Sequence, residues 1–243
     1  SGGPKMVSPG LAGFDTIMRL HSSKMIASEE ARWALTKGNP IHDAIREIAA
    51  MSKVHFSIDV TINKDHRITS VYAGDLFAVH DAACATAARI ATQPVPHLFD
   101  IVVTTNSGYP LDMNLYQVVK GMSAAAQIVR YGGHIICVAE CKDGIPEHGE
   151  YGSILASRDN PEALLAMICD TEHNRQDQWQ VQIQAQIQKR ATVYLKSSHL
   201  THKQIEAAHL IPIESLEDTI GQLIQQCRDE ARICVLPEGP QTI

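Results

Sequence analysis

The spacing of hydrophobic positions differs between the first and second parts of the chain. In the first part, helical spacing predicts three short helices, over 13–21, 28–36 and 40–51. Strict alternation in VHFSIDVTI and HRITSVYAG predicts a β-hairpin over 54–74. Asp75 then has the side chain of a helix N-cap, and an alanine-rich helix is expected to run from it to Arg89.

In the second part, apolar β-branched runs alternate with helical segments. The expected strands are 100–105, 134–140, 192–197, 209–213 and 232–236. The expected helices are 113–129, 161–169, 176–189, 201–208 and 215–227. Strands separated by helices predict an α/β fold with a parallel, Rossmann-like sheet and right-handed crossovers.

Two features of this pattern leave room for interpretation. The stretch QVQIQAQIQ alternates glutamine with apolar residues as a strand would, but flanking helix formers favour a helix. The stretch QPVPH at 93–97 holds two prolines, which cannot continue the preceding helix and favour an extended connector. We therefore expect one domain over 1–92 and another over 97–243.

Length and charge narrow the class of protein. The 243 residues suffice for one large domain or two small ones. The formal net charge is −6 and the basic residues form no run, so nucleic acid is not an expected partner. No apolar segment is long enough to cross a bilayer and no charged-then-apolar leader is present, so no membrane association is expected. The six cysteines form no CxxC pair, which favours reduced core thiols in a cytoplasmic protein.

The segment NSGYPLDMNLYQVVKGM at 106–122 carries the best candidate site. It joins an expected buried strand to the start of a helix, which is where α/β proteins bind anions through unpaired backbone N–H groups. Tyr116, Gln117 and Lys120 are spaced to share one helix face, and together they suit a small carboxylate. A solvated helix face with an amphipathic tyrosine is the alternative.

The ligand crevice of such a sheet is expected beyond the carboxyl ends of its strands. Those ends carry residues 104–109, 140–143, 197–199 and 237–239. The chain has no GxGxxG, Walker or HExxH motif, which disfavours a standard dinucleotide dehydrogenase and a helix-borne zinc site.

Several segments, in one order along the chain, are similar to a known family. They are GGPKMVSPGLAGFDTIMRLHS, FAVHDAACATA, NSGYPLDMNLYQVVKGMSAAAQIVRYGGHII, VAECKDGIPEHGEYG, DQWQVQI and VLPEGPQT. Together they resemble the nickel-pincer-dependent lactate racemase family. The resemblance implies two α/β domains with the active site between them. Residues up to about Arg89 would be the α+β tail of a cofactor-holding N-terminal domain, and those from about Leu98 the C-terminal domain.

The resemblance also implies a cofactor, a pyridinium mononucleotide with two sulfur-containing arms that hold nickel as a pincer. In the family one arm is tethered to a lysine and the metal takes a histidine ligand; Lys5 and His21 match these positions. A lysine amine can form a covalent link to a thioacid, and imidazole suits nickel. Without the resemblance, Lys5 would be a mobile surface amine and His21 a polar residue near a helix end.

Members of the family racemise or epimerise 2-hydroxy acids by moving a hydride from C2 to the cofactor and back. Tyr116, Gln117 and Lys120 match residues that line the substrate pocket, and Lys120 would hold the carboxylate or the developing ketone oxygen. Trp179 matches a pocket aromatic through a looser block, with ordinary packing as the alternative. The space near Trp179 and Tyr109 would decide between lactate and a larger acid. The implied partners are a 2-hydroxy acid and the cofactor-synthesis proteins.

One part of the family pattern has no match. The family's general acid/base histidine pair precedes the GGPK segment, where this sequence begins. Five histidines are candidates by residue type alone: His42, His80, His97, His134 and His148. We therefore expect the chain to be part of a longer protein and to be inactive by itself. The alternative function is a non-catalytic module that binds a carboxylate or a sugar phosphate.

Overall fold

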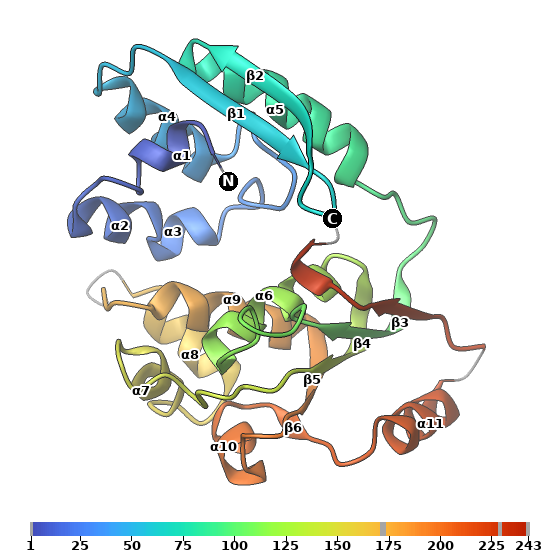
Figure 1. Cartoon of the computed structure of the whole chain (residues 1–243). Coiled ribbons are helices and arrows are strands. Elements are labelled where there is room, and N and C mark those ends of the chain that lie inside the picture. The colour runs from blue at the N-terminus through green and yellow to red at the C-terminus, as the bar shows by residue number, and fades with distance from the viewer. Residues whose placement is uncertain (1, 171–173, 228–229, 242–243) are drawn as a thin grey trace. The chain divides into compact units, whose positions relative to one another are not determined.

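The computed structural model describes residues 2–170, 174–227 and 230–241. The chain divides into two compact units, which we call unit 1, ending at Gln93, and unit 2, beginning at Pro94 (Figure 1). Within the described ranges, every helix is too short or too polar to span a lipid bilayer.

Unit 1 combines short helices with an antiparallel hairpin (Figure 1). Its helices are α1 (Pro4–Val7), α2 (Phe14–Leu20), α3 (Ser23–Ile26), α4 (Pro40–Ala50) and α5 (Leu76–Ala91), and its strands are β1 (Ser57–Ile62) and β2 (Ile68–Gly74). Asn39 caps α4 by accepting hydrogen bonds from the amides of Ile41 and His42. Asp75 caps α5 in the same way. The hairpin, α2, α4 and α5 confirm the sequence-based predictions.

Helix α4 is the platform of unit 1. Its buried residues Ala44 and Ile45 form a small core with Leu20 at the end of α2. Helices α1 and α3 also contact α4. The two segments that carry Lys5 and His21 are therefore supported by the same helix.

The helix predicted over 28–36 is wrong. These residues form turns and bends, and the short helix α3 lies just before them. The hydroxyl of Ser28 donates to the Glu30 carboxylate and accepts from the Glu30 amide, so it closes a local turn instead of capping a helix. Ala34 has a φ of 60°, a left-handed conformation that interrupts any helix there. Helix α1 was not predicted.

Unit 2 is built on a five-stranded parallel sheet with strand order β6-β5-β4-β3-β7. The strands are β3 (Phe99–Thr105), β4 (Val129–Val138), β5 (Ala191–Lys196), β6 (Ile211–Pro212) and β7 (Ile233–Leu236). The helices are α6 (Leu115–Ala126), α7 (Tyr151–Leu155), α8 (Pro161–Ile168), α9 (Gln178–Arg190), α10 (His202–Ala207) and α11 (Leu216–Gln226), followed by the 3-10 turn η1 (Gly239–Gln241). The predicted α/β fold and parallel sheet are confirmed.

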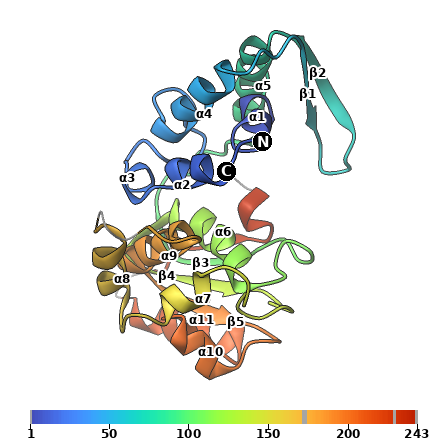
Figure 2. The ribbon, with the colours of Figure 1, turned by 90° about the vertical axis from the view of Figure 1, so that its left-hand side faces the viewer.

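The sheet is covered on both faces. Val102, Ile135 and Val193 point into the larger core, which α6, α8 and α9 cover. Ile101 and Ile136 point to the opposite face, where Leu223 of α11 packs on them. Figure 2 shows α6 and α9 on one side of the sheet and α11 on the other. Burial on both faces explains why these strands are continuous apolar runs in the sequence.

Three details of unit 2 differ from the predictions. Strand β4 begins at Val129, earlier than expected, because Val129 pairs with Phe99 before a register shift. Helix α7 was not predicted. Cys169 is exposed, although core thiols were expected. The glutamine-rich stretch is helical, as favoured.

All six cysteines are free thiols. Burial raises the pKa of Cys141 to about 11, and it raises the pKa of Cys137 further. These two buried thiols are therefore protonated and unreactive near neutral pH.

Candidate functional site

The start of α6 is held in place by two asparagines. The Asn114 side chain accepts a hydrogen bond from the Gln117 amide, 3.1 Å away, and so caps the helix. The buried Asn106 side chain accepts from the Gly121 amide at 2.9 Å and donates to the Leu111 carbonyl. The loop between β3 and α6 is therefore fixed to the helix that carries the candidate residues.

Tyr116 and Trp179 are in direct contact. The Trp179 indole Nε1 donates to the Tyr116 hydroxyl at 2.9 Å. The side-chain amide of Gln180 donates to the Tyr116 backbone carbonyl at 2.6 Å. Burial raises the pKa of Tyr116 more than the hydrogen bond from Trp179 lowers it. The phenol thus keeps its proton near neutral pH. Since the indole N–H is the donor in their bond, the phenol proton can be donated to an anion.

Gln117 and Lys120 form a second pair on the same helix. The Lys120 ammonium donates to the Gln117 amide oxygen at 2.6 Å. Lys120 is exposed, whereas Gln117 is half-buried. Helix α6 therefore carries two hydrogen-bonded pairs, Tyr116 with Trp179 of α9 and Lys120 with Gln117. We call Tyr116, Gln117, Lys120 and Trp179 the α6 cluster.

Tyr109 is separate from the α6 cluster. It lies in the loop before α6 with 70% of its surface exposed. In the part of the chain that the structure describes, no hydrogen bond or ring contact joins it to Tyr116 or Trp179.

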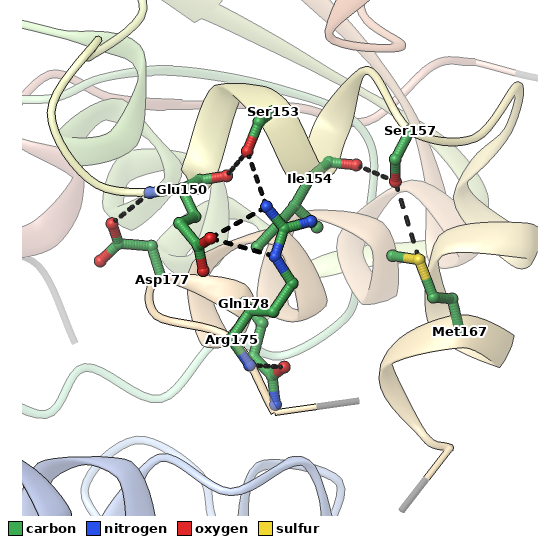
Figure 3. Close-up of polar contacts among 8 residues, drawn as sticks. All are labelled: Glu150, Ser153, Ile154, Ser157, Met167, Arg175, Asp177 and Gln178. Carbon is green, nitrogen blue, oxygen red and sulfur yellow. Dashed lines mark hydrogen bonds and ion pairs between the residues drawn. The ribbon is translucent and has the colours of Figure 1, made fainter. Parts of the chain in front are cut away.

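A polar network fixes the start of α9, which carries Trp179 (Figure 3). The Arg175 guanidinium donates to the Glu150 carboxylate at 3.0 and 3.2 Å, and the Arg175 amide donates to the Gln178 side chain at 2.8 Å. The Glu150 amide donates to the Asp177 carboxylate at 3.1 Å. These bonds connect the start of α7 to the first turn of α9 and so position Trp179.

In unit 1, a backbone hydrogen bond orients the His21 ring. His21 follows the last residue of α2, and its Nδ1 donates to the Ile17 carbonyl at 2.8 Å. In the neutral ring this bond places the lone pair on Nε2, the arrangement that metal-binding histidines use. Lys5 is exposed on α1, where its amine is accessible to a reacting group. Both residues fit the cofactor that the sequence resemblance implies.

A metal at His21 would need further donors from outside the described residues. Within residues 2–170, 174–227 and 230–241, no group of three or more His, Cys, Asp or Glu side chains could hold a metal ion. A single histidine ligand is compatible with a cofactor that brings other donors to the metal.

The other candidate histidines are dispersed. His42 and His80 stack on each other in unit 1, with ring centroids 5.7 Å apart, and His80 lies 3.7 Å from the Asp59 carboxylate. Burial, and then the nearby His42, lower the pKa of His80. His134 packs against Tyr194 on the sheet, and His148 is exposed in a loop. In the described part of unit 2, no hydrogen bond or ring contact joins His134 or His148 to the α6 cluster.

A cavity lies where the ligand crevice was expected. It has a volume of about 440 Å³ and lies beyond the carboxyl ends of β3, β4, β5 and β7. Thr105, Ser107, Glu140, Ser197 and Glu238 are among its lining residues. The α6 cluster does not line it, so the crevice and the cluster are distinct features of unit 2.

The sequence interpretation missed the residues that hold the site in place. Asn114 could have been found, because an asparagine three residues before a glutamine at a helix start resembles a capping box. Asn106 gave no such signal, since its partners are fixed only by the folded loop.

Replacing Asn114 with alanine is expected to lower the free energy of unfolding of unit 2 by about 0.5–2 kcal/mol, because the Gln117 amide loses its cap. Urea denaturation monitored by circular dichroism measures this. Gln127→Ala, at the exposed end of the same helix, is the matched control and should change stability by less than about 0.5 kcal/mol. Equal effects of the two changes would contradict the capping role.

The comparisons with known proteins agree on one family. A family model described as the lactate racemase C-terminal domain matches residues 96–243. The lactate racemase of Lactiplantibacillus plantarum is 35% identical over 241 residues, which cover 98% of this chain and 56% of that protein. The lactate racemase of Thermoanaerobacterium thermosaccharolyticum is 31% identical and covers 100% of this chain and 57% of that protein.

Solved structures extend the comparison. The lactate racemase apoprotein from Thermoanaerobacterium thermosaccharolyticum matches with a TM-score of 0.92 at 30% identity, over 100% of this chain and 58% of that one. A protein from Thermotoga maritima matches with a TM-score of 0.68 at 16% identity over 99% of this chain and 61% of that one, which shows a shared fold alone. The chain spans little more than half the length of the curated relatives it matches. With its family model covering more than half of its own residues, this chain belongs to the lactate racemase family.

Proposed function

We propose that the protein containing this chain is a nickel-dependent racemase or epimerase of a 2-hydroxy acid, lactate or an acid similar to it. The observation that carries the proposal is the α6 cluster, which places the Tyr116 phenol and the Lys120 ammonium four residues apart on α6. The chain that carries it belongs to the lactate racemase family. A small carboxylate is the ligand that such a set of groups suits.

Within this proposal the α6 cluster binds and orients the substrate. Lys120 forms a charge-assisted hydrogen bond with the substrate carboxylate, or with the oxygen on which negative charge develops. The protonated Tyr116 donates to the same anion, while Trp179 keeps its ring in place. Gln117 holds the Lys120 ammonium and limits the rotamers that it samples.

Lys5 and His21 would hold the nickel-pincer nucleotide, Lys5 through a covalent link to one sulfur-containing arm and His21 through Nε2. When bound, this group supplies the electrophilic centre that takes up and returns the hydride of C2. The hydrogen bond from His21 to Ile17 fixes the ring orientation in advance, which strengthens a metal ligand.

Proton transfer at the substrate hydroxyl is assigned to no histidine of residues 1–243. In the described part of unit 2, His134 packs against Tyr194 and makes no contact with the α6 cluster. We therefore expect this chain alone to be inactive, although it carries Lys120, the cation proposed to bind the substrate. The six free thiols support a reducing compartment such as the cytoplasm for the enzyme and its cofactor-synthesis partners.

The proposal is tested on the full-length gene product, made together with the cofactor-synthesis enzymes. We expect mass spectrometry to find the peptide with Lys5 modified and metal analysis to find about one nickel per chain. Lys5→Ala should remove the adduct, and His21→Ala should lower the nickel content at least tenfold. Lys24→Ala is the matched control, an exposed lysine of α3, and should change neither. An unmodified Lys5 peptide in a protein without nickel would refute the cofactor assignment.

A further inference from the structure

The cavity at the carboxyl edge of the sheet in unit 2 holds chemistry that the proposed function does not use. Four of the five strands end at it, and its volume of about 440 Å³ is in the range of small-molecule sites. Open α/β sheets bind ligands at the carboxyl ends of the two strands between which the strand order reverses. In this sheet these strands are β3 and β7.

Asp112 brings a buried carboxylate to this cavity. Only 4% of the residue is exposed, and its Oδ2 accepts from the Glu140 amide at 3.0 Å. Its Oδ1 is buried and has no hydrogen-bond partner among the described residues. The hydroxyl of Ser107, which also lines the cavity, is buried in the same way. A buried carboxylate oxygen without a partner is costly, so a donor supplied by a ligand would be strongly favoured.

The charges around the cavity indicate what charge a ligand with such a donor should carry. Asp112, Glu140 and Glu238 carry three formal negative charges, against one positive charge on Lys196. The Lys196 ammonium already donates to the Glu214 carbonyl. The negative balance disfavours a second hydroxy-acid anion and favours a cation. The absence of a metal-binding group among the described residues favours an organic cation over a metal ion.

We propose that this cavity binds a small molecule with a primary ammonium group, whose N–H donors pair with Asp112 and with the Ser107 hydroxyl. An ammonium offers three donors and a positive charge, which match two buried acceptors and the surrounding carboxylates. The site is separate from the α6 cluster and independent of the proposed function, because it requires neither the cofactor nor a hydroxy acid.

Three probes of similar size test the proposal on the full-length gene product: ethanolamine, ethylene glycol and glycolate. They differ mainly in bearing a positive charge, no charge or a negative charge. We expect saturable binding of ethanolamine in a ¹H–¹⁵N NMR titration, with shifts at the amides of Ser107, Glu140 and Ser197. Ethylene glycol should bind at least tenfold more weakly, and glycolate should cause no saturable shift at these three amides. Absence of saturable ethanolamine binding, or equal binding of ethylene glycol, overturns the proposal.

Variants locate the binding. Asp112→Asn should weaken ethanolamine binding at least tenfold, and Asp143→Asn, an exposed acid that does not line the cavity, should change it less than twofold. Glu238→Gln removes one lining charge from an exposed position, so it tests the same charge balance if Asp112→Asn fails to fold. It should weaken binding about threefold. An unchanged affinity in Glu238→Gln together with a loss in Asp143→Asn would overturn the assignment to this cavity.

Discussion

Replacing Lys120 with methionine is expected to lower kcat/KM for lactate by about 100- to 1,000-fold in the full-length gene product. Methionine keeps most of the length of the side chain but carries neither charge nor donor. The loss is expected because, in the proposed site, Lys120 is the cation that binds the substrate carboxylate and orients C2. A coupled assay with a dehydrogenase specific for one lactate enantiomer measures the rate.

The matched control is Lys203→Met, which removes an exposed lysine from α10. Its kcat/KM should remain within about twofold of the unmodified protein, because a solvated surface charge outside the α6 cluster is screened by salt. Nickel content should be unchanged in both variants. A Lys120→Met protein that retained nearly full kcat/KM would move the substrate away from the α6 cluster and contradict the proposed function.

Replacing Gly121 with alanine is expected to lower the free energy of unfolding of unit 2 by roughly 1–3 kcal/mol. A Cβ atom at Gly121 would lie 2.5 Å from the Thr105 carbonyl oxygen, so either α6 or β3 must move. Gly239 of η1 packs on the same spot, because its own Cβ would lie 3.2 Å from the Gly121 Cα. The added methyl group would therefore meet backbone atoms, and rotating a side chain cannot relieve the clash.

The control for this change is Gly221→Ala on α11. Nothing lies within 4 Å of a Cβ placed there, and the residue is inside a helix. Alanine at this position should raise stability by about 0.5–1 kcal/mol, since glycine is the poorer helix former. Urea denaturation of both variants gives the comparison. Equal stability of Gly121→Ala and the unmodified protein would contradict the close packing of α6 on β3.

Hydrophobic periodicity predicted the fold of unit 2 because its strands are buried on both faces. Runs such as that of β3 cannot be amphipathic helices, and the helices between them leave a parallel sheet as the arrangement that buries them. The same reasoning failed over 28–36 in unit 1. There, Ser28 followed by acidic residues resembles a helix start, but its side chain closes a local turn that no helix follows.

The candidate site could be predicted where it depends on local spacing. Tyr116, Gln117 and Lys120 lie three and four residues apart on one helix, so their proximity follows from helix geometry. Trp179 lies on another helix, and its bond to Tyr116 exists only because α6 packs against α9. The buried oxygen of Asp112 was likewise invisible, since PLDMN looks like an ordinary polar loop until the strand ends surround it.

The order of the strands affects how unit 2 is made on the ribosome. Strand β3 is synthesised first of the five, yet one of its two neighbours, β7, is synthesised last. Arg232 and Asp100, joined by a hydrogen bond, are 132 residues apart in the chain. At typical translation speeds, the side of β3 that pairs with β7 remains unpaired for on the order of 10 seconds. During that interval an apolar, unpaired strand is open to pairing with other nascent chains, so a chaperone that shields it would raise the yield of folded protein.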